Sequence, residues 1–212
     1  MTQHPNLRFV VTGTGRCGTQ WISGVFNRLG LPCGHEAIFS HTRRENKGLV
    51  GDSSWMAAPF LGELDLVVFH QLRHPAKVIR SLTVSALSGL FQPGQPWGQF
   101  FLEHCPEAAE YQEGRAPTIA WCAMMWMRWN QMIEPHSDFG YPLEGMGPGV
   151  VQYMLSVLGE ERSLEEIKEA LDRPPVNRHV EADVPELDPC VLEALPFYEE
   201  LREVAKGYGY EV

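Results

Sequence analysis

A glycine-rich segment near the start of the chain has the composition of an anion-binding loop. It follows the short apolar run 8–12, which is typical of a buried strand. Apolar residues then recur at helical spacing up to Gly30, a suitable residue to end a helix. Backbone N–H groups in such a turn, together with the helix dipole, can hold a phosphate. The residues expected to form this loop are Gly13, Thr14, Gly15, Arg16, Cys17, Gly18 and Thr19.

The loop is close to a Walker A motif without being one. Gly13 and Gly18 have the Walker spacing and Thr19 stands at the hydroxyl position, but the Lys between them is missing. Arg16 supplies the cation of the loop instead. A plain tight turn is the alternative interpretation. A catalytic thiol at Cys17 is disfavoured, because no base stands beside it in the sequence.

A second anion motif lies in residues 72–82. Arg73 would stand at the carboxyl end of the apolar run 66–72, and Pro75 suits the first turn of a helix that carries Ser81. Both side chains can then face the crevice where ligands bind in open α/β folds. An arginine fork with a hydroxyl is a good receptor for a terminal phosphate. The alternatives are a surface ion pair for Arg73 and a hydroxyl bonded to its own helix for Ser81.

Together the two motifs resemble the sulfotransferases that use 3′-phosphoadenosine 5′-phosphosulfate (PAPS). The loop 13–19 is similar to the segment that holds the 5′-phosphosulfate in that family. Arg73, seven residues and Ser81 are similar to its 3′-phosphate motif. The resemblance is clear over residues 8–90 and fainter to residue 180. It implies PAPS as the cofactor, released as 3′,5′-adenosine bisphosphate (PAP), with no metal.

The resemblance also implies site residues outside the two motifs. Gln20 would join the cofactor contacts, and Asn177 and Arg178 would replace the late loop of cytosolic members. A carboxylate after the first helix would be the general base, which favours Glu36, with His35 as the second candidate. Arg16 would stabilise charge on the leaving phosphate.

An acceptor pocket is expected beside these groups. Ser53, Ser54 and Trp55 would line it, since a Trp next to small hydroxyls suits a sugar or a lipid head group, although Trp55 could equally belong to the core. The tryptophans of 118–134 are more typical of packing than of an adenine platform. The reaction would be an in-line transfer of a sulfuryl group to a hydroxyl or amine of a small-molecule, sugar or lipid acceptor.

The order of elements predicts the fold class. Strand, turn and helix occur twice in the first part, which indicates an α/β, P-loop-like three-layer fold with a central, mainly parallel sheet flanked by helices. Residues 1–212 are expected to form one domain, with 91–116 as a lid or substrate-side insertion. Residues 51–54 are interpreted as a loop. Further helices are expected at 118–134, 150–158, 163–171 and 191–206, with a short strand near Tyr141.

Composition narrows the class of protein. The 212 residues have a formal charge of −10, which disfavours a nucleic-acid partner. Residues 1–90 hold 9 Lys/Arg against 5 Asp/Glu, whereas 91–212 hold 8 against 22, so the basic part coincides with the two anion motifs. We expect neither a membrane span nor a secretory signal. The five cysteines, with no CxxC pair, favour a reduced cytoplasmic setting and no metal site. The sequence does not indicate an oligomeric state.

Two other functions share the glycine loop. A P-loop nucleotide kinase would need a Lys in the loop and a magnesium carboxylate, and the missing Lys counts against it. A non-catalytic nucleotide-binding protein on the same scaffold is the other alternative, because the chain is short for the family. Magnesium-dependent ATP binding would favour the kinase, and nucleotide binding without turnover would favour the binding protein.

Overall fold

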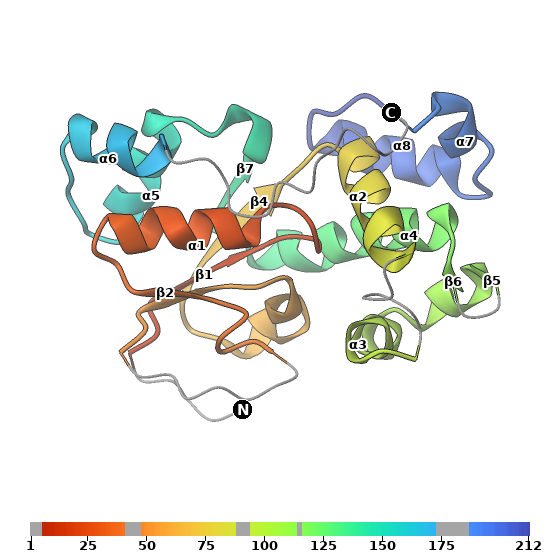
Figure 1. Cartoon of the computed structure of the whole chain (residues 1–212), viewed down its shortest axis with the longest axis horizontal. Coiled ribbons are helices and arrows are strands. Elements are labelled where there is room, and N and C mark those ends of the chain that lie inside the picture. The colour runs from red at the N-terminus through yellow and green to blue at the C-terminus, as the bar shows by residue number, and fades with distance from the viewer. Residues whose placement is uncertain (1–5, 41–47, 88–93, 114–115, 173–186) are drawn as a thin grey trace. The chain divides into compact units, whose positions relative to one another are not determined.

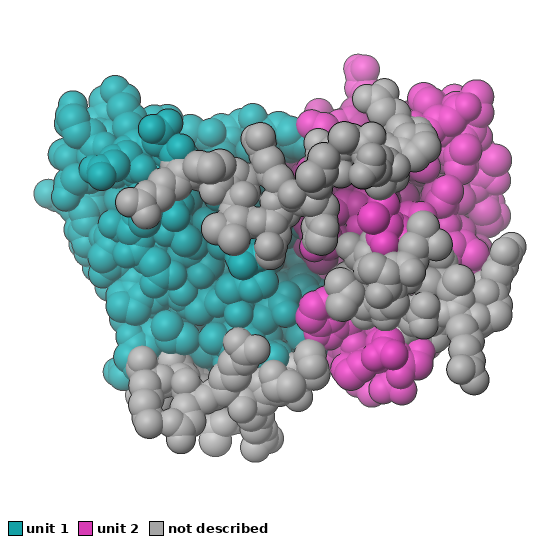
Figure 2. Space-filling model, viewed as in Figure 1, with its two compact units in different colours: residues 1–13, 17–72, 133–178 teal, residues 14–16, 73–132, 179–212 magenta. Residues whose placement is uncertain are grey.

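The computed structural model describes residues 6–40, 48–87, 94–113, 116–172 and 187–212. The chain divides into two compact units (Figure 2). Unit 1 comprises residues 1–13, 17–72 and 133–178, and unit 2 comprises 14–16, 73–132 and 179–212. The expected single domain stays a prediction.

Unit 1 is built on a five-stranded sheet in the order β2-β3-β1-β4-β7 (Figure 1). Each neighbouring pair of its strands is parallel. The carboxyl ends therefore lie along one edge, where ligands bind in open α/β sheets. The predicted α/β fold with a central parallel sheet and flanking helices is confirmed. The strands are β1 (Phe9–Thr12), β2 (Cys33–His35), β3 (Gly51–Ser53), β4 (Val67–Leu72) and β7 (Phe139–Pro142).

One face of this sheet packs against three helices. Phe9 and Val11 alternate along β1 and join a buried core with residues of α1 (Thr19–Arg28), α5 (Pro148–Val157) and α6 (Leu164–Leu171). Burial of this apolar area stabilises the sheet, and with it the carboxyl end of β1, where the glycine-rich loop begins. The left-handed Gly30, with φ 79°, follows α1 as expected. Ser163 and Glu166 form the predicted capping box of α6.

The prediction of a loop at residues 51–54 was wrong, since Gly51–Ser53 is the strand β3. Gly, Asp and Ser have low strand propensity, but β3 is held between β1 and β2. A Cβ on Gly51 would overlap the ring of Phe9, so glycine lets the two strands pair. Three short 3₁₀ segments complete unit 1, at η1 (Trp55–Glu63), η3 (Glu134–His136) and η4 (Leu143–Gly145).

Unit 2 is mainly helical. The indoles of Trp121, Trp126 and Trp129 are fully buried, and Phe101 packs edge-on to Trp121, so the tryptophan stripe is core as expected. A lid at residues 91–116 stays a prediction, and residues 88–93 and 114–115 lie outside the described part. The elements are α2 (Pro75–Leu87), α3 (Pro96–His104), η2 (Pro106–Tyr111), β5 (Gln112–Glu113), β6 (Ala116–Pro117), α4 (Ile119–Ile133), α7 (Pro189–Glu193) and α8 (Tyr198–Gly207).

The expected single helix over 191–206 was wrong, because two helices, α7 and α8, occupy this region. Pro196 lies between them, and its ring disfavours a helical conformation at Leu195. Helical periodicity alone did not reveal this break. Within the described residues, no helix is long and apolar enough to cross a membrane.

We predict that Gly51→Ala destabilises the protein. The added methyl must displace the buried Phe9 ring, and overpacking of this kind costs about 1–3 kcal/mol. Urea unfolding monitored by circular dichroism would measure the free energy of unfolding. Gly140→Ala in β7 is the matched control, because its Cβ would meet no atom closer than 4.0 Å, so a change of about 0.5 kcal/mol or less is expected. Equal losses in both variants would contradict the packing argument.

Candidate active site

The loop 13–19 connects β1 to α1 at the carboxyl edge of the sheet. A Cβ on Gly13 would overlap the carbonyl oxygen of Gln71, so only glycine allows the chain to turn so close to β4. Gly18 is the N-cap of α1 with φ 99°, and as a glycine it has no side chain to cap the helix. The first turn also lacks acidic residues. This helix N-terminus is therefore open to an anion.

Arg16 joins the two sequence motifs within unit 2. Its Nε donates a hydrogen bond to Ser81 Oγ at 3.0 Å, and Arg73 Nη1 donates to the Arg16 carbonyl oxygen at 3.0 Å. The Arg16 backbone is left-handed, with φ 70°, which is uncommon for a residue with a side chain. Arg73 and Ser81, which lie 57 and 65 positions after Arg16 in the sequence, are thus both bonded to it.

The electrostatics of this cluster favour an anion. Burial first, and then the positive charge of Arg73, lowers the pKa of Arg16. Both effects disfavour the charged guanidinium, and the negative charge of a bound phosphate or sulfate would favour it. An arginine pair with a hydroxyl offers the hydrogen-bond donors that a phosphate needs.

Trp126 holds the turn at Arg73, which belongs to the second anion motif. Its indole Nε1 donates to the Arg73 carbonyl oxygen at 3.0 Å, within unit 2. His74 Nδ1 accepts from the Ala76 N–H at 3.2 Å, which shapes the start of α2. From the sequence, Trp126 was expected only to pack in the core. Its helical spacing indicated burial, but the hydrogen bond to the turn after β4 depends on tertiary structure.

Unit 1 brings His35 and Glu36 to the start of α1. His35 Nε2 lies 3.2 Å from Thr19 Oγ1 and 3.9 Å from Glu36 Oε1. Glu36 is the second left-handed residue with a side chain, at φ 50°. Such backbone conformations cost about 1–3 kcal/mol and cluster at functional sites. The Glu36 carboxylate and the His35 imidazole can act as acid–base groups. Helix N-termini such as that of α1 favour phosphate.

The three residues expected to contact the acceptor are buried. Ser53 and Ser54 are 0% exposed and Trp55 is 2% exposed. Ser54 Oγ donates to the Phe39 carbonyl oxygen at 2.7 Å and accepts from the Met56 N–H at 3.1 Å. Ser53 Oγ is a buried hydroxyl for which the described residues provide no hydrogen-bond partner. Their role in acceptor binding stays a prediction.

Gln71 is a residue that the sequence reasoning missed. Its side chain is fully buried, and its Nε2 donates to the Cys17 carbonyl oxygen at 2.6 Å. Its Oε1 accepts from Tyr141 OH at 2.8 Å, which connects the loop to β7. A polar residue near the end of an apolar strand was the available signal. Cys17 itself is fully buried, in accord with the low weight given to a catalytic thiol.

Three further residues were predicted to contact the cofactor: Gln20, Asn177 and Arg178. Gln20 is exposed in the first turn of α1. Asn177 and Arg178 lie outside the described residues. Among those that are described, no group of three or more His, Cys, Asp or Glu side chains could hold a metal ion.

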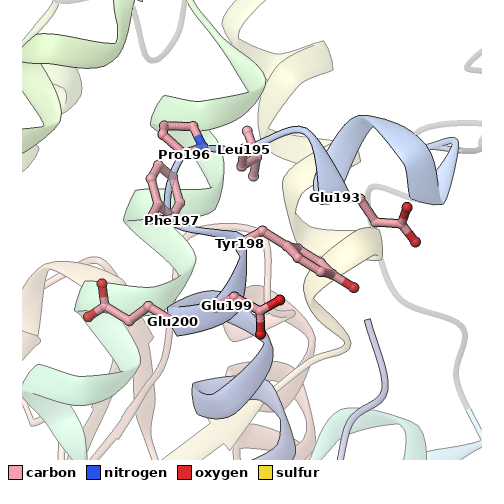
Figure 3. Close-up of a pocket in the computed structure, with 7 residues that line it drawn as sticks. All are labelled: Glu193, Leu195, Pro196, Phe197, Tyr198, Glu199 and Glu200. Carbon is pink, nitrogen blue, oxygen red and sulfur yellow. The ribbon is translucent and has the colours of Figure 1, made fainter.

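A hollow of about 460 Å³ lies elsewhere, between the end of α7 and the start of α8 (Figure 3). None of the predicted site residues lines it. Glu193, Glu199 and Glu200 are among the residues that line it, and an acidic lining disfavours a phosphate. This hollow is therefore not a candidate for the anion site.

Comparison with solved structures bears on the fold. A sulfotransferase from Alicyclobacillus acidocaldarius matches over 99% of this chain and 98% of its own, with 14% identity and a TM-score of 0.52. The chain has the sulfotransferase fold. A mouse sulfotransferase complexed with PAP matches over 96% of this chain and 85% of its own, with 12% identity and a TM-score of 0.49. No protein-family model and no curated protein matches the sequence.

We predict that Gln71→Leu destabilises this sulfotransferase fold by about 2 kcal/mol. The change removes the acceptor of the buried Tyr141 hydroxyl and the amide that donates to the Cys17 carbonyl, and a buried hydroxyl that loses its partner costs about 1–3 kcal/mol. Denaturant unfolding would measure the loss. The double variant Gln71→Leu/Tyr141→Phe should be more stable than Gln71→Leu, because it also removes the stranded hydroxyl. A further loss in the double variant would contradict this account.

Proposed function

We propose that this chain is a PAPS-dependent sulfotransferase. The observation that carries the proposal is the bond from Arg16 Nε to Ser81 Oγ, with Arg73 bound to the Arg16 carbonyl oxygen. It supports one nucleotide site built by two motifs that are separate in the sequence. Sulfuryl transfer, moreover, is chemistry that the fold accommodates, although a fold alone does not determine a function.

The residues fit the phosphate groups of PAPS. The loop turns at Gly13, where a Cβ cannot be placed, and the uncapped N-terminus of α1 follows it. We assign the 5′-phosphosulfate to the loop amides and Arg16, and the 3′-phosphate to Arg73 and Ser81. When bound, PAPS would supply the sulfuryl group and depart as PAP.

The protein side of the reaction needs a base and fixed donors. Glu36 would take the proton of the acceptor hydroxyl or amine as its oxygen or nitrogen attacks sulfur. Arg16 and the loop amides would stabilise the negative charge that grows on the departing phosphate. His35, bonded to Thr19, is the alternative base. We propose a small-molecule, sugar or lipid acceptor, with Ser53, Ser54 and Trp55 as its predicted contacts.

Calorimetric titration with PAP, AMP and ATP–magnesium tests the cofactor. We expect PAP to bind more tightly than AMP, because only PAP has the 3′-phosphate. Arg73→Ala should weaken PAP binding about 10- to 100-fold by removing charge-assisted hydrogen bonds, with AMP binding changed much less. Lys77→Ala is the matched control, since it removes an exposed positive charge from α2, the helix that begins two residues after Arg73.

The alternatives have distinct outcomes in that titration. Equal binding of PAP and AMP would overturn the assignment of Arg73 and Ser81. Magnesium-dependent binding of ATP in preference to PAP would favour a nucleotide kinase. Tight PAP binding with no PAP release from PAPS in the presence of phenols, sugars and long-chain alcohols would favour a binding protein.

Glu36→Gln tests the base. The amide has nearly the same shape but cannot accept the proton, so the rate of PAP release at saturating PAPS should fall by at least about 100-fold. The dissociation constant for PAP should stay within about two-fold, because Glu36 is not assigned to the nucleotide. If Glu36→Gln keeps its rate while His35→Gln loses it, the roles of the two residues are reversed.

A further inference from the structure

Asp52 is a buried carboxylate that the proposed reaction does not use. It lies in the middle of β3 and is 0% exposed. Its Oδ1 accepts the Ala37 N–H at 3.2 Å, and its Oδ2 accepts the N–H groups of Ile38 and Phe39 at 3.0 Å each. Three consecutive amides of the segment after Glu36 therefore converge on one side chain.

These bonds determine the backbone that follows β2. Burial raises the pKa of Asp52, and the N–H donors from residues 37–39 act against that rise by favouring the carboxylate. A carboxylate is an acceptor at both oxygens, so it can hold all three amides at once. The neutral acid would keep one oxygen as a donor and lose part of this arrangement.

The two residues that follow Asp52 hold the two ends of the same segment. Glu36 N–H donates to the Ser53 carbonyl oxygen at 3.1 Å, and Ser54 Oγ donates to the Phe39 carbonyl oxygen. Residues 36–39 are thus bound at three successive positions, 52–54. These bonds offset the cost of the left-handed backbone at Glu36.

Gly34 leaves room for this arrangement. A Cβ at that position would lie 2.5 Å from Asp52 Oδ1 and 2.6 Å from the Ala37 Cβ. Any side chain at residue 34 would therefore push the carboxylate away from its first amide. Gly34, Asp52 and Glu36 therefore depend on one another for their conformation within unit 1.

We infer that Asp52 is a positioning residue for the general base. It holds the segment 37–39 so that Glu36 keeps the backbone conformation from which its carboxylate can reach the acceptor proton. The inference rests on the proposed function. Asp52 would act through Glu36 without touching the substrate, and Ser54 would support the other end of the segment at Phe39.

Asp52→Asn in the full chain is the main test. The variant keeps the shape but replaces one acceptor oxygen by an NH₂ group that faces N–H donors. We expect PAP release from PAPS, with phenols, sugars and long-chain alcohols as acceptors, to slow about 10- to 100-fold at saturating PAPS, as for a misplaced catalytic group. Binding of PAP should change less than about two-fold.

A second background separates positioning from general damage. In Glu36→Gln, where no base is left to position, adding Asp52→Asn should slow PAP release by less than about two-fold. Ser54→Ala removes one hydrogen bond to the segment 36–39 instead of three, so it should give a smaller loss of rate than Asp52→Asn. Asp138→Asn is the matched control, because Asp138 also accepts a backbone N–H, from Val68 at 2.8 Å in the same unit.

Amide hydrogen exchange supplies a readout that does not depend on activity. In Asp52→Asn the amides of residues 37–39 should exchange faster, with the amides of β1 and β4 unchanged. Unchanged protection at 37–39 would overturn the inference. So would a wild-type rate in Asp52→Asn, or an equal loss in the Glu36→Gln background. A wild-type chain that releases no PAP with any acceptor would instead overturn the proposed function, and the catalytic role of Asp52 with it.

Discussion

The turn at Gly13 is the constraint on which the rest of the site depends. The chain leaves β1 so close to the Gln71 carbonyl that no side chain fits, and the Gln71 amide then binds the carbonyl of Cys17. This double contact fixes where α1 begins, and with it the direction of its uncapped N-terminus. Tyr141 extends the same network to β7, so three strands determine the course of one loop.

Two residues with proposed roles in the reaction have a left-handed backbone. Arg16 and Glu36 are the described residues with a side chain and a positive φ, and each is held by bonds from another element. Arg73 binds the backbone of Arg16, and β3 binds the segment that begins at Glu36. Strain of this kind persists only where neighbouring structure determines it, and here it coincides with the proposed charge-stabilising and proton-accepting groups.

Packing supports the two clusters in different ways. In unit 1 an apolar core between the sheet and three helices supports the strands whose ends form the loop. In unit 2 the buried Trp126 contributes both packing and a hydrogen bond to the turn at Arg73. A residue that sequence periodicity assigns to the core can therefore also position a functional group, because an indole has one polar atom in a large apolar ring.

The sequence by itself determined the strand–loop–helix units and the parallel α/β class, and it indicated the two proposed anion motifs, because glycine placement, apolar periodicity and proline positions are local signals. It also indicated Glu36 and His35 through a resemblance. Only the tertiary structure decided that Gly51–Ser53 pairs as a strand, that Gln71 holds the loop and that Asp52 is a buried acceptor. Those features arise from contacts between residues distant in sequence, which propensity and spacing do not encode. The break of the last helix at Pro196 was a local signal, and the stronger helical periodicity around it obscured that signal.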